Sequence, residues 1–487
     1  MFTQEEYNVA KYGSRELYAR VNILNYQFQN VGIISGVVLG TPSFTNDSNN
    51  SIRRTCRFEF YPKDSTFDIT EGSKIWIDKY IQVDIGIKTS FSKQPVYTNM
   101  GIYLLNDPSQ TYSAEQNVIS IDGYDLMAKM TGLRGGNLQG LDYVIPEKSN
   151  VRNVLISTIA LFGFDKYIIE EYPILTPYEI SISAGGCGYD IINEILNILP
   201  NWQAYFDVDG VFHFDRIPSG YQESQQVEEM TMVTDDLWKN TLISYTKNYD
   251  ETNIKNYIEV LGKTHDSGLN TDTTTIVSNH YKTKCSSIIQ LEDSLVFGFT
   301  TPSTVLSDPI LEIDVVDVNN TVIATTPRNI RVEDGSIPTL TANTLYYVQY
   351  VSQGVATPYY KFLGGLQPYA IATETNPNSP FDINGTTGVL RIVLSGGNYD
   401  NINSDYLAQQ RAEFELYQRC RLQDSVTIQC VPIYWLDTNW LIEITLPNRN
   451  ENNTETAQYL IKSINTSCGV SETQSIQLMR YYPYYNY

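Results

Sequence analysis

The stretch GYDIINEILNILPNWQAYFDVDGVFHFDRI, residues 188–217, decides the fold. In its first half, apolar residues recur at the three-and-four spacing of an amphipathic helix, and Pro200 ends the pattern because proline lacks a donor amide. In its second half, apolar and polar residues alternate around Asp209-Gly210, which predicts a hairpin with a tight two-residue turn. So short a helix needs a docking partner, and the hairpin beside it is the simplest one. The apolar face of the predicted helix consists of Ile191, Ile192, Ile195, Leu196 and Leu199.

Composition limits the class of protein. The 487 residues suffice for two to four domains, and 33 Lys+Arg against 55 Asp+Glu give a net charge of −22. That balance argues against wrapping nucleic acid or binding anionic membranes, because both need clustered cations. The 37 tyrosines favour pleated surfaces and interfaces over helical bundles. With no apolar run of about 18 residues and no signal-like N-terminus, we expect no membrane span and no secretion signal. Six dispersed cysteines indicate reduced thiols.

Hydrophobic patterning predicts a mainly β chain with a minor α component. Asn150 or Ser149 is a suitable cap for a helix in 146–170, and Ser404 for a helix over 405–422. Gly101–Tyr124 and Tyr459–Tyr482 echo each other, since each has a strand, a polar loop and an alternating strand that ends in tyrosine. We therefore predict two related barrels. The expected divisions are a first β-barrel (1–132), a helix-hairpin α+β module (133–229), a second β-barrel with the helix that leads into it (230–265 plus 401–487), and an inserted β-sandwich (266–400).

Four passages carry a resemblance to a known family. They are ISIDGYDLMAKM (119–130), the opening stretch extended to Pro218, SDYLAQQRAEFELYQRC (404–420), and WLIEITLPN followed by AQYLIKSI (440–448 and 457–464). In this order they resemble the baseplate hub proteins of tailed phages and phage-like injection machines, the late control protein family. The resemblance covers roughly residues 15–260 and 400–482 and leaves out the insertion at 266–400.

The resemblance implies an architecture and a task. Hub proteins carry two tube-like barrels per chain and form trimers, whose pseudo-sixfold ring joins the sixfold tail tube to the threefold central spike or tip. The implied partners are two further copies of the chain, tail tube or distal tail proteins, the spike or tip protein and the tape measure protein. DNA or another payload only passes through the lumen, where we hypothesise that like charge repels phosphates. The implied location is the virion tail, after synthesis in the host cytoplasm.

Enzymatic alternatives find little support in the residues. The sequence has neither a Gly-x-Ser-x-Gly elbow nor a Gly-rich phosphate loop, and His213 between two phenylalanines is interpreted as structural. His265, His280 and Cys285 match no zinc spacing. We predict no catalytic residues, no cofactor and no metal. A cell-wall glycoside hydrolase with paired carboxylates stays open as an alternative in so acidic a chain.

Tyrosines supply the candidate binding residues. In the insertion, aromatic rings suit either glycan stacking, as in a carbohydrate-binding receptor-recognition protein, or a sandwich core with subunit contacts, and we favour the core. The C-terminal YYPYYNY (481–487) is predicted to pack against a neighbouring chain. The candidate glycan contacts are Tyr346, Tyr347, Tyr359 and Tyr360, and the candidate interface residues are Tyr481, Tyr482, Tyr484, Tyr485 and Tyr487.

Overall fold

The chain folds into two compact units, Met1–Glu251 with Leu422–Asn486 and Thr252–Arg421 with Tyr487. Within the described residues, no helix has both the length and the apolar character needed to cross a bilayer. The computed structural model describes all residues except 1, 35, 77, 141, 172–173, 200–201, 219–231, 251–252, 266–267, 287–290, 294, 317–318, 320, 421–422, 448–454, 470 and 482–487.

The first β module is an antiparallel sheet in the order β3-β4-β7-β6-β5-β1-β2. Its strands alternate inward and outward, and in β4 the inward residues Cys56, Phe58 and Phe60 are buried in one core. The predicted β character of this segment is therefore confirmed. The elements are α1 (Gln4–Ala10), β1 (Glu16–Leu24), β2 (Asn30–Ile33), β3 (Gly36–Asp47), β4 (Arg54–Pro62), η1 (Ser65–Phe67), β5 (Tyr80–Lys88), β6 (Val96–Tyr112), β7 (Asn117–Tyr124) and η2 (Leu126–Lys129).

The helix-hairpin module forms as predicted except at its turn. Ile191, Ile192 and Ile195 of α3 are fully buried with residues of the hairpin. The hairpin loop has three residues, because the Asp207 amide still donates to the Val211 carbonyl at 3.0 Å and, of the loop residues, only Gly210 has a positive φ (73°). The predicted two-residue turn is therefore wrong. The elements are β8 (Tyr143–Ile145), α2 (Val151–Leu161), β9 (Tyr167–Ile169), β10 (Ile180–Ile182), α3 (Gly188–Ile198), β11 (Trp202–Phe206) and β12 (Phe212–Arg216).

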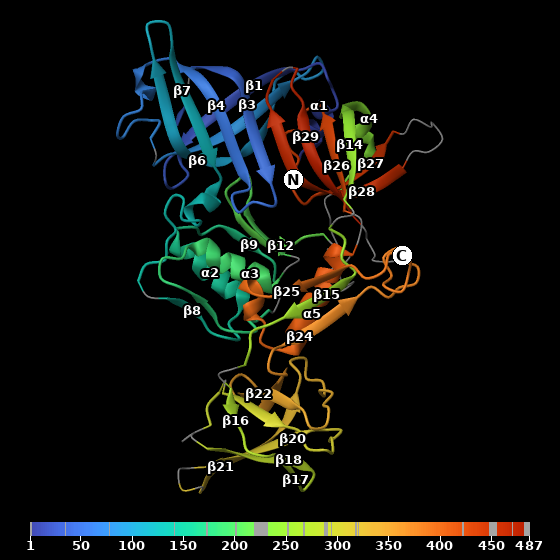
Figure 1. Cartoon of the computed structure of the whole chain (residues 1–487). Helices are drawn as coiled ribbons and strands as arrows, with labels where there is room; N and C mark the ends of the chain where they lie inside the picture. The colour runs from blue at the N-terminus through green and yellow to red at the C-terminus, as the bar shows by residue number, and fades with distance from the viewer. Residues whose placement is uncertain are drawn as a thin grey trace. The chain divides into compact units, whose positions relative to one another are not determined.

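The second β module continues the sheet of the first. Its strands are hydrogen-bonded in the order β14-β26-β29-β28. The first part of β28 also pairs with β27, and its last part pairs with β3 of the first module. Figure 1 shows the blue strands of the first module continuing into the red strands of the second. Trp238, Ile461 and Leu478 belong to its buried core. The elements are β13 (Met232–Val233), α4 (Asp235–Thr241), β14 (Leu242–Asp250), β26 (Gln423–Cys430), β27 (Leu441–Leu446), β28 (Glu455–Ser467) and β29 (Gln474–Arg480).

The other unit contains two sheets. One is eight-stranded, in the order β16-β19-β22-β23-β21-β20-β18-β17, and the other is β24-β15-β25. Its elements are β15 (Tyr257–Leu261), β16 (Leu269–Asn270), β17 (Thr275–Val277), β18 (His280–Ser286), β19 (Val296–Thr300), β20 (Ile310–Val316), β21 (Val322–Arg331), β22 (Leu345–Val351), β23 (Tyr359–Gly364), β24 (Tyr369–Thr373), β25 (Arg391–Leu394), η4 (Gly397–Asn401) and α5 (Asp405–Arg419).

The boundaries of this unit differ from the expected insertion at 266–400. β15 and α5 were assigned to the second barrel, yet β15 lies between β24 and β25, and Ala408 and Ala412 of α5 share one core with Ile258 and Val260 of β15. The small alanines let the helix lie close to the sheet. Only the mainly β character and the capped helix at Ser404, whose hydroxyl accepts from the Leu407 amide at 3.3 Å, follow the prediction here.

Candidate assembly interface: the junction of the two β modules

The two β modules meet edge to edge. Ser43–Asp47 of β3 pairs antiparallel with Ser463–Ser467 of β28, so that backbone hydrogen bonding runs unbroken from one module to the next. At the centre of this module junction, the Thr45 hydroxyl lies 3.1 Å from the Asn465 carboxamide oxygen and donates to it. Two modules joined in this way behave as one continuous sheet.

Arg54 connects the two modules through buried polar contacts. Its side chain is 4% exposed and forms an ion pair with Asp437 at 2.6 Å, which ties the start of β4 to the loop between β26 and β27. The same guanidinium donates to the Phe206 carbonyl at the end of β11. The Arg54 amide donates to the buried carboxylate of Asp125 at 2.9 Å. Burial raises the pKa of Asp125 against the opposing effect of these Arg54 contacts.

Arg53 makes the second half of this network. It donates to the Gln203 carboxamide oxygen of β11 at 2.8 Å, and its guanidinium lies 4.6 Å from the centre of the Tyr205 ring. The same Gln203 oxygen accepts from Asn439 of the second module at 2.7 Å. Three segments that are distant in sequence are therefore held by one connected set of buried polar groups.

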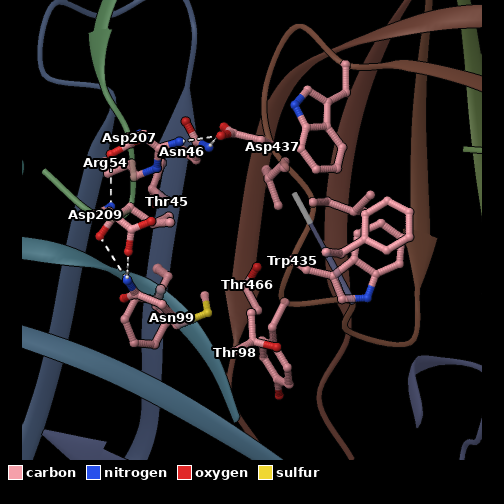
Figure 2. A pocket seen from close by; sticks show the side chains of 18 of the residues that line it. Thr45, Asn46, Arg54, Thr98, Asn99, Asp207, Asp209, Trp435, Asp437 and Thr466 are labelled. Carbon is pink, nitrogen blue, oxygen red and sulfur yellow. Dashed lines mark hydrogen bonds and ion pairs between the residues drawn. The ribbon is translucent and has the colours of Figure 1, made fainter. Parts of the chain in front are cut away.

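A cavity of about 340 Å³ lies beside the module junction. β3, β6, the β11–β12 loop and the segment around Trp435 line it. Figure 2 shows Arg54 and Asn46 facing Asp437, with the Asn46 amide donating at 2.8 Å, and Asn99 facing Asp209 at 2.9 Å. These contacts join β3 and β4 to the loop that carries Asp437, and β6 to the β11–β12 loop, as expected of a structural junction.

His213 occupies a charged clamp on the hairpin. Its Nε2 lies 3.0 Å from an Asp207 oxygen, its Nδ1 lies 3.7 Å from an Asp215 oxygen, and its ring stacks on Tyr205. Although burial opposes it, the two carboxylates raise the pKa of His213 to about 9. The imidazolium in turn lowers the pKa of Asp207, again against burial. The interpretation of His213 as structural agrees with these partners.

We expect this clamp to make the stability of the hairpin unit depend on pH. The folded pKa lies above the ordinary value of 6.5, so the stabilisation is fully present below pH 6.5 and is lost as pH rises through about 9. The protonated His213 is expected to add up to about 3 kcal/mol to the free energy of unfolding. Urea unfolding should show the natural chain losing more stability than His213→Gln between pH 6.5 and 9. Equal losses in the two chains would contradict the role of the clamp.

The candidate tyrosines of the insertion lie mostly in its core. Tyr346, Tyr347 and Tyr360 are 9%, 4% and 0% exposed, so their rings are covered by protein and present no face to a sugar. Tyr359 is partly exposed, and its proposed glycan contact stays a prediction. The three buried rings agree with the favoured interpretation as core residues.

The aromatic C-terminus is described only at its start. Tyr481 is 7% exposed and packs with Leu441 and Leu460 of its own chain. Tyr482, Tyr484, Tyr485 and Tyr487 lie outside the described residues, so their contact with a neighbouring chain stays a prediction.

The residues weighed as a metal site lie apart. His265 contacts the Tyr347 ring, His280 lies 3.6 Å from Glu312, and Cys285 is buried in the core of the eight-stranded sheet. In the described part of the chain, no cluster of three His, Cys, Asp or Glu side chains is arranged to hold a metal ion. No disulfide joins any of the six cysteines, all of which are described.

Sequence reasoning missed Arg53, Arg54 and Asp437. A signal was present, because residues 53–54 are the one adjacent pair of arginines in an acidic chain, and they directly precede an inward-facing apolar alternation. Long cations at the start of a buried strand indicate paired carboxylates elsewhere in the fold.

Comparison with known proteins gives two kinds of match. The family model described as "Domain of unknown function (DUF5048)" matches residues 378–485, and no curated protein matches significantly. The 43 kDa tail protein of prophage MuSo2 from Shewanella oneidensis is similar in structure, with a TM-score of 0.50, 11% identity, and coverage of 96% of this chain and 98% of that one.

Two further solved structures resemble the chain more weakly. The tail protein from Neisseria meningitidis MC58 has a TM-score of 0.47, 9% identity, and coverage of 95% and 96% of the two chains. Prophage tail protein gp18 from Listeria monocytogenes has a TM-score of 0.45, 10% identity, and coverage of 94% of each chain. The chain has the fold of a phage tail protein, as its resemblance to the baseplate hub proteins predicted.

Proposed function

We propose that this chain is a structural hub protein of a phage tail or a related injection machine, and that three copies form a pseudo-sixfold ring. One observation carries the proposal. The two β modules repeat one strand order, β3-β4-β7-β6-β5 in the first and β14-β26-β29-β28-β27 in the second, and they are joined edge to edge. If the two joined β modules of one chain are neighbours in a ring, three chains supply a ring of six modules.

The physical advantage of such a chain is symmetry matching. A ring of six similar modules offers six equivalent contacts to a sixfold tube, while three identical chains keep a threefold face for a spike or tip. The tail tube, a distal tail protein, the tape measure protein and the spike are the partners of the proposal. The net charge of −22 supports passage of a polyanionic payload without adhesion.

Oligomeric state tests the proposal. Native mass spectrometry of the full chain is expected to give a species of three chain masses, and negative-stain images of it should show a ring with an open centre and threefold symmetry. A chain that stays monomeric at micromolar concentration, alone and with its tail tube protein, would refute the hub assignment. Enzymatic activity plays no part in the proposed role.

A further inference from the structure

The proposed ring needs a second kind of contact, between chains, and the repeat within one chain identifies it. Within each module, residues that are paired on neighbouring strands form a row that runs across the sheet from strand to strand. In the first module one row runs Leu105–Gly123–Cys56–Phe44. The corresponding row of the second module is Ile461–Leu478–Val426–Lys247.

A second row confirms this correspondence. Gln110–Ile119–Phe60 in the first module matches Thr466–Gln474–Cys430 in the second. Both long strands advance five residues between the two rows, Leu105 to Gln110 and Ile461 to Thr466, while their partner strands advance four. Each therefore has one extra residue, a β-bulge, between the two rows, directly after Ile461 in β28 and one rung further along in β6. The outer part of β6 is thus equivalent to the part of β28 that pairs with β3, and β14 is equivalent to β3.

The equivalent edges have open backbones. In the described residues, β14 pairs only with β26, and β6 beyond Leu105, whose amide still donates to the Lys79 carbonyl, pairs only with β7. Figure 1 shows the β6–β7 hairpin, in cyan, extending past its neighbouring strands. An unpaired strand edge is a template for another strand. Because β14 is the edge strand of the second module and the outer part of β6 belongs to the first, one chain presents both halves of a head-to-tail contact.

We propose that β6 of one copy pairs antiparallel with β14 of the next copy, in the register of the module junction. This rests on the proposed trimeric hub. The equivalences place Ser109 opposite Asn248 and Thr111 opposite Thr246 of the neighbouring copy. Around a ring of six modules, the β3–β28 contact within each chain would then alternate with the β6–β14 contact between neighbouring chains.

The side chains at these positions support the register. The module junction pairs Thr45 with Asn465, a hydroxyl with a carboxamide, and Asn248 with Ser109 is the same chemical pair with the two strands exchanged. The module junction also pairs Ser43 with Ser467, two hydroxyls, and Thr246 with Thr111 repeats that pair. Ser109, Thr111, Thr246 and Asn248 are all exposed in the single chain. Matching cross-strand polar pairs of this kind stabilise antiparallel sheets.

Cysteine cross-linking of the full chain tests the register. The chain with Ser109→Cys and Asn248→Cys, oxidised mildly, is expected to run as a covalent trimer on a non-reducing gel, with no larger ladder, because directly opposite Cβ atoms lie within disulfide range. The matched control is Ser109→Cys with Ser244→Cys, on the same strand and face but about 13 Å away. It should give monomer.

Charge substitution supplies a second readout that needs no disulfide. Ser109→Lys with Asn248→Lys places like charges at each contact and should raise the concentration for trimer dissociation about tenfold. Ser109→Lys with Asn248→Asp should retain the trimer. A natural chain that is trimeric by native mass spectrometry, but whose Ser109/Asn248 cysteines stay uncrosslinked, would overturn this register and leave the hub proposal standing. A monomeric natural chain would overturn both.

Discussion

Replacing Arg54 with methionine is expected to lower the free energy of unfolding by about 3–5 kcal/mol, because the change removes one partner of a buried ion pair. Arg54 is 4% exposed and Asp437 is 21% exposed, so Asp437 would lose its cation in a place where little water replaces it. The Phe206 carbonyl would lose its guanidinium donor as well. Both losses fall on the module junction, so we expect the two β modules to separate more readily.

Tryptophan fluorescence during urea unfolding measures this effect selectively. All five tryptophans, Trp76, Trp202, Trp238, Trp435 and Trp440, lie in the unit that contains the two β modules. The signal therefore reports the unfolding of that unit, because the unit Thr252–Arg421 contains no tryptophan.

Arg57→Met is the matched control on the same strand. Arg57 and Asp122 form an ion pair at 3.6 Å with side chains 68% and 45% exposed, and such surface pairs contribute about 1 kcal/mol or less. The control should therefore unfold close to the natural chain. Equal unfolding midpoints for Arg54→Met and Arg57→Met would show that the buried network does not hold the module junction.

Local patterns in the sequence were sufficient for the elements near the hairpin. The three-and-four spacing of Ile191, Ile192 and Ile195 fixes one buried face, and Asn150 accepts from the Asn153 amide at 3.0 Å as a helix cap. Such signals act over a few residues, so they are visible without the fold. The length of the hairpin loop was not visible in the sequence, because Asp207 and not Val208 pairs with Val211, which leaves three residues in the loop.

Long-range pairing was beyond the sequence pattern. The Arg54–Asp437 pair spans 383 residues and the Thr45–Asn465 contact spans 420, and neither has a periodic signature. The polar residues at the module junction resemble those of any exposed strand. The assignment of β15 and α5 failed for a related reason. An amphipathic helix shows that it has a buried face but does not show which sheet covers it.

Replacing Phe212 with alanine is the second change from which we expect a loss of about 3–5 kcal/mol. Phe212 is 0% exposed, and its ring meets the Phe206 ring edge-on at 5.4 Å in the core that the hairpin shares with α3. Removing the ring would leave a void that neighbouring rings in regular strands fill only in part. Ile168→Ala on the adjacent strand β9 is the matched control, since Ile168 is 57% exposed and the change should shift stability by about 0.5 kcal/mol or less. Tryptophan fluorescence again provides the measurement, with Trp202 stacked 5.0 Å from Phe214 on the same hairpin. If Phe212→Ala and Ile168→Ala unfolded at the same urea concentration, the hairpin would not be the core element that the opening stretch of sequence predicts.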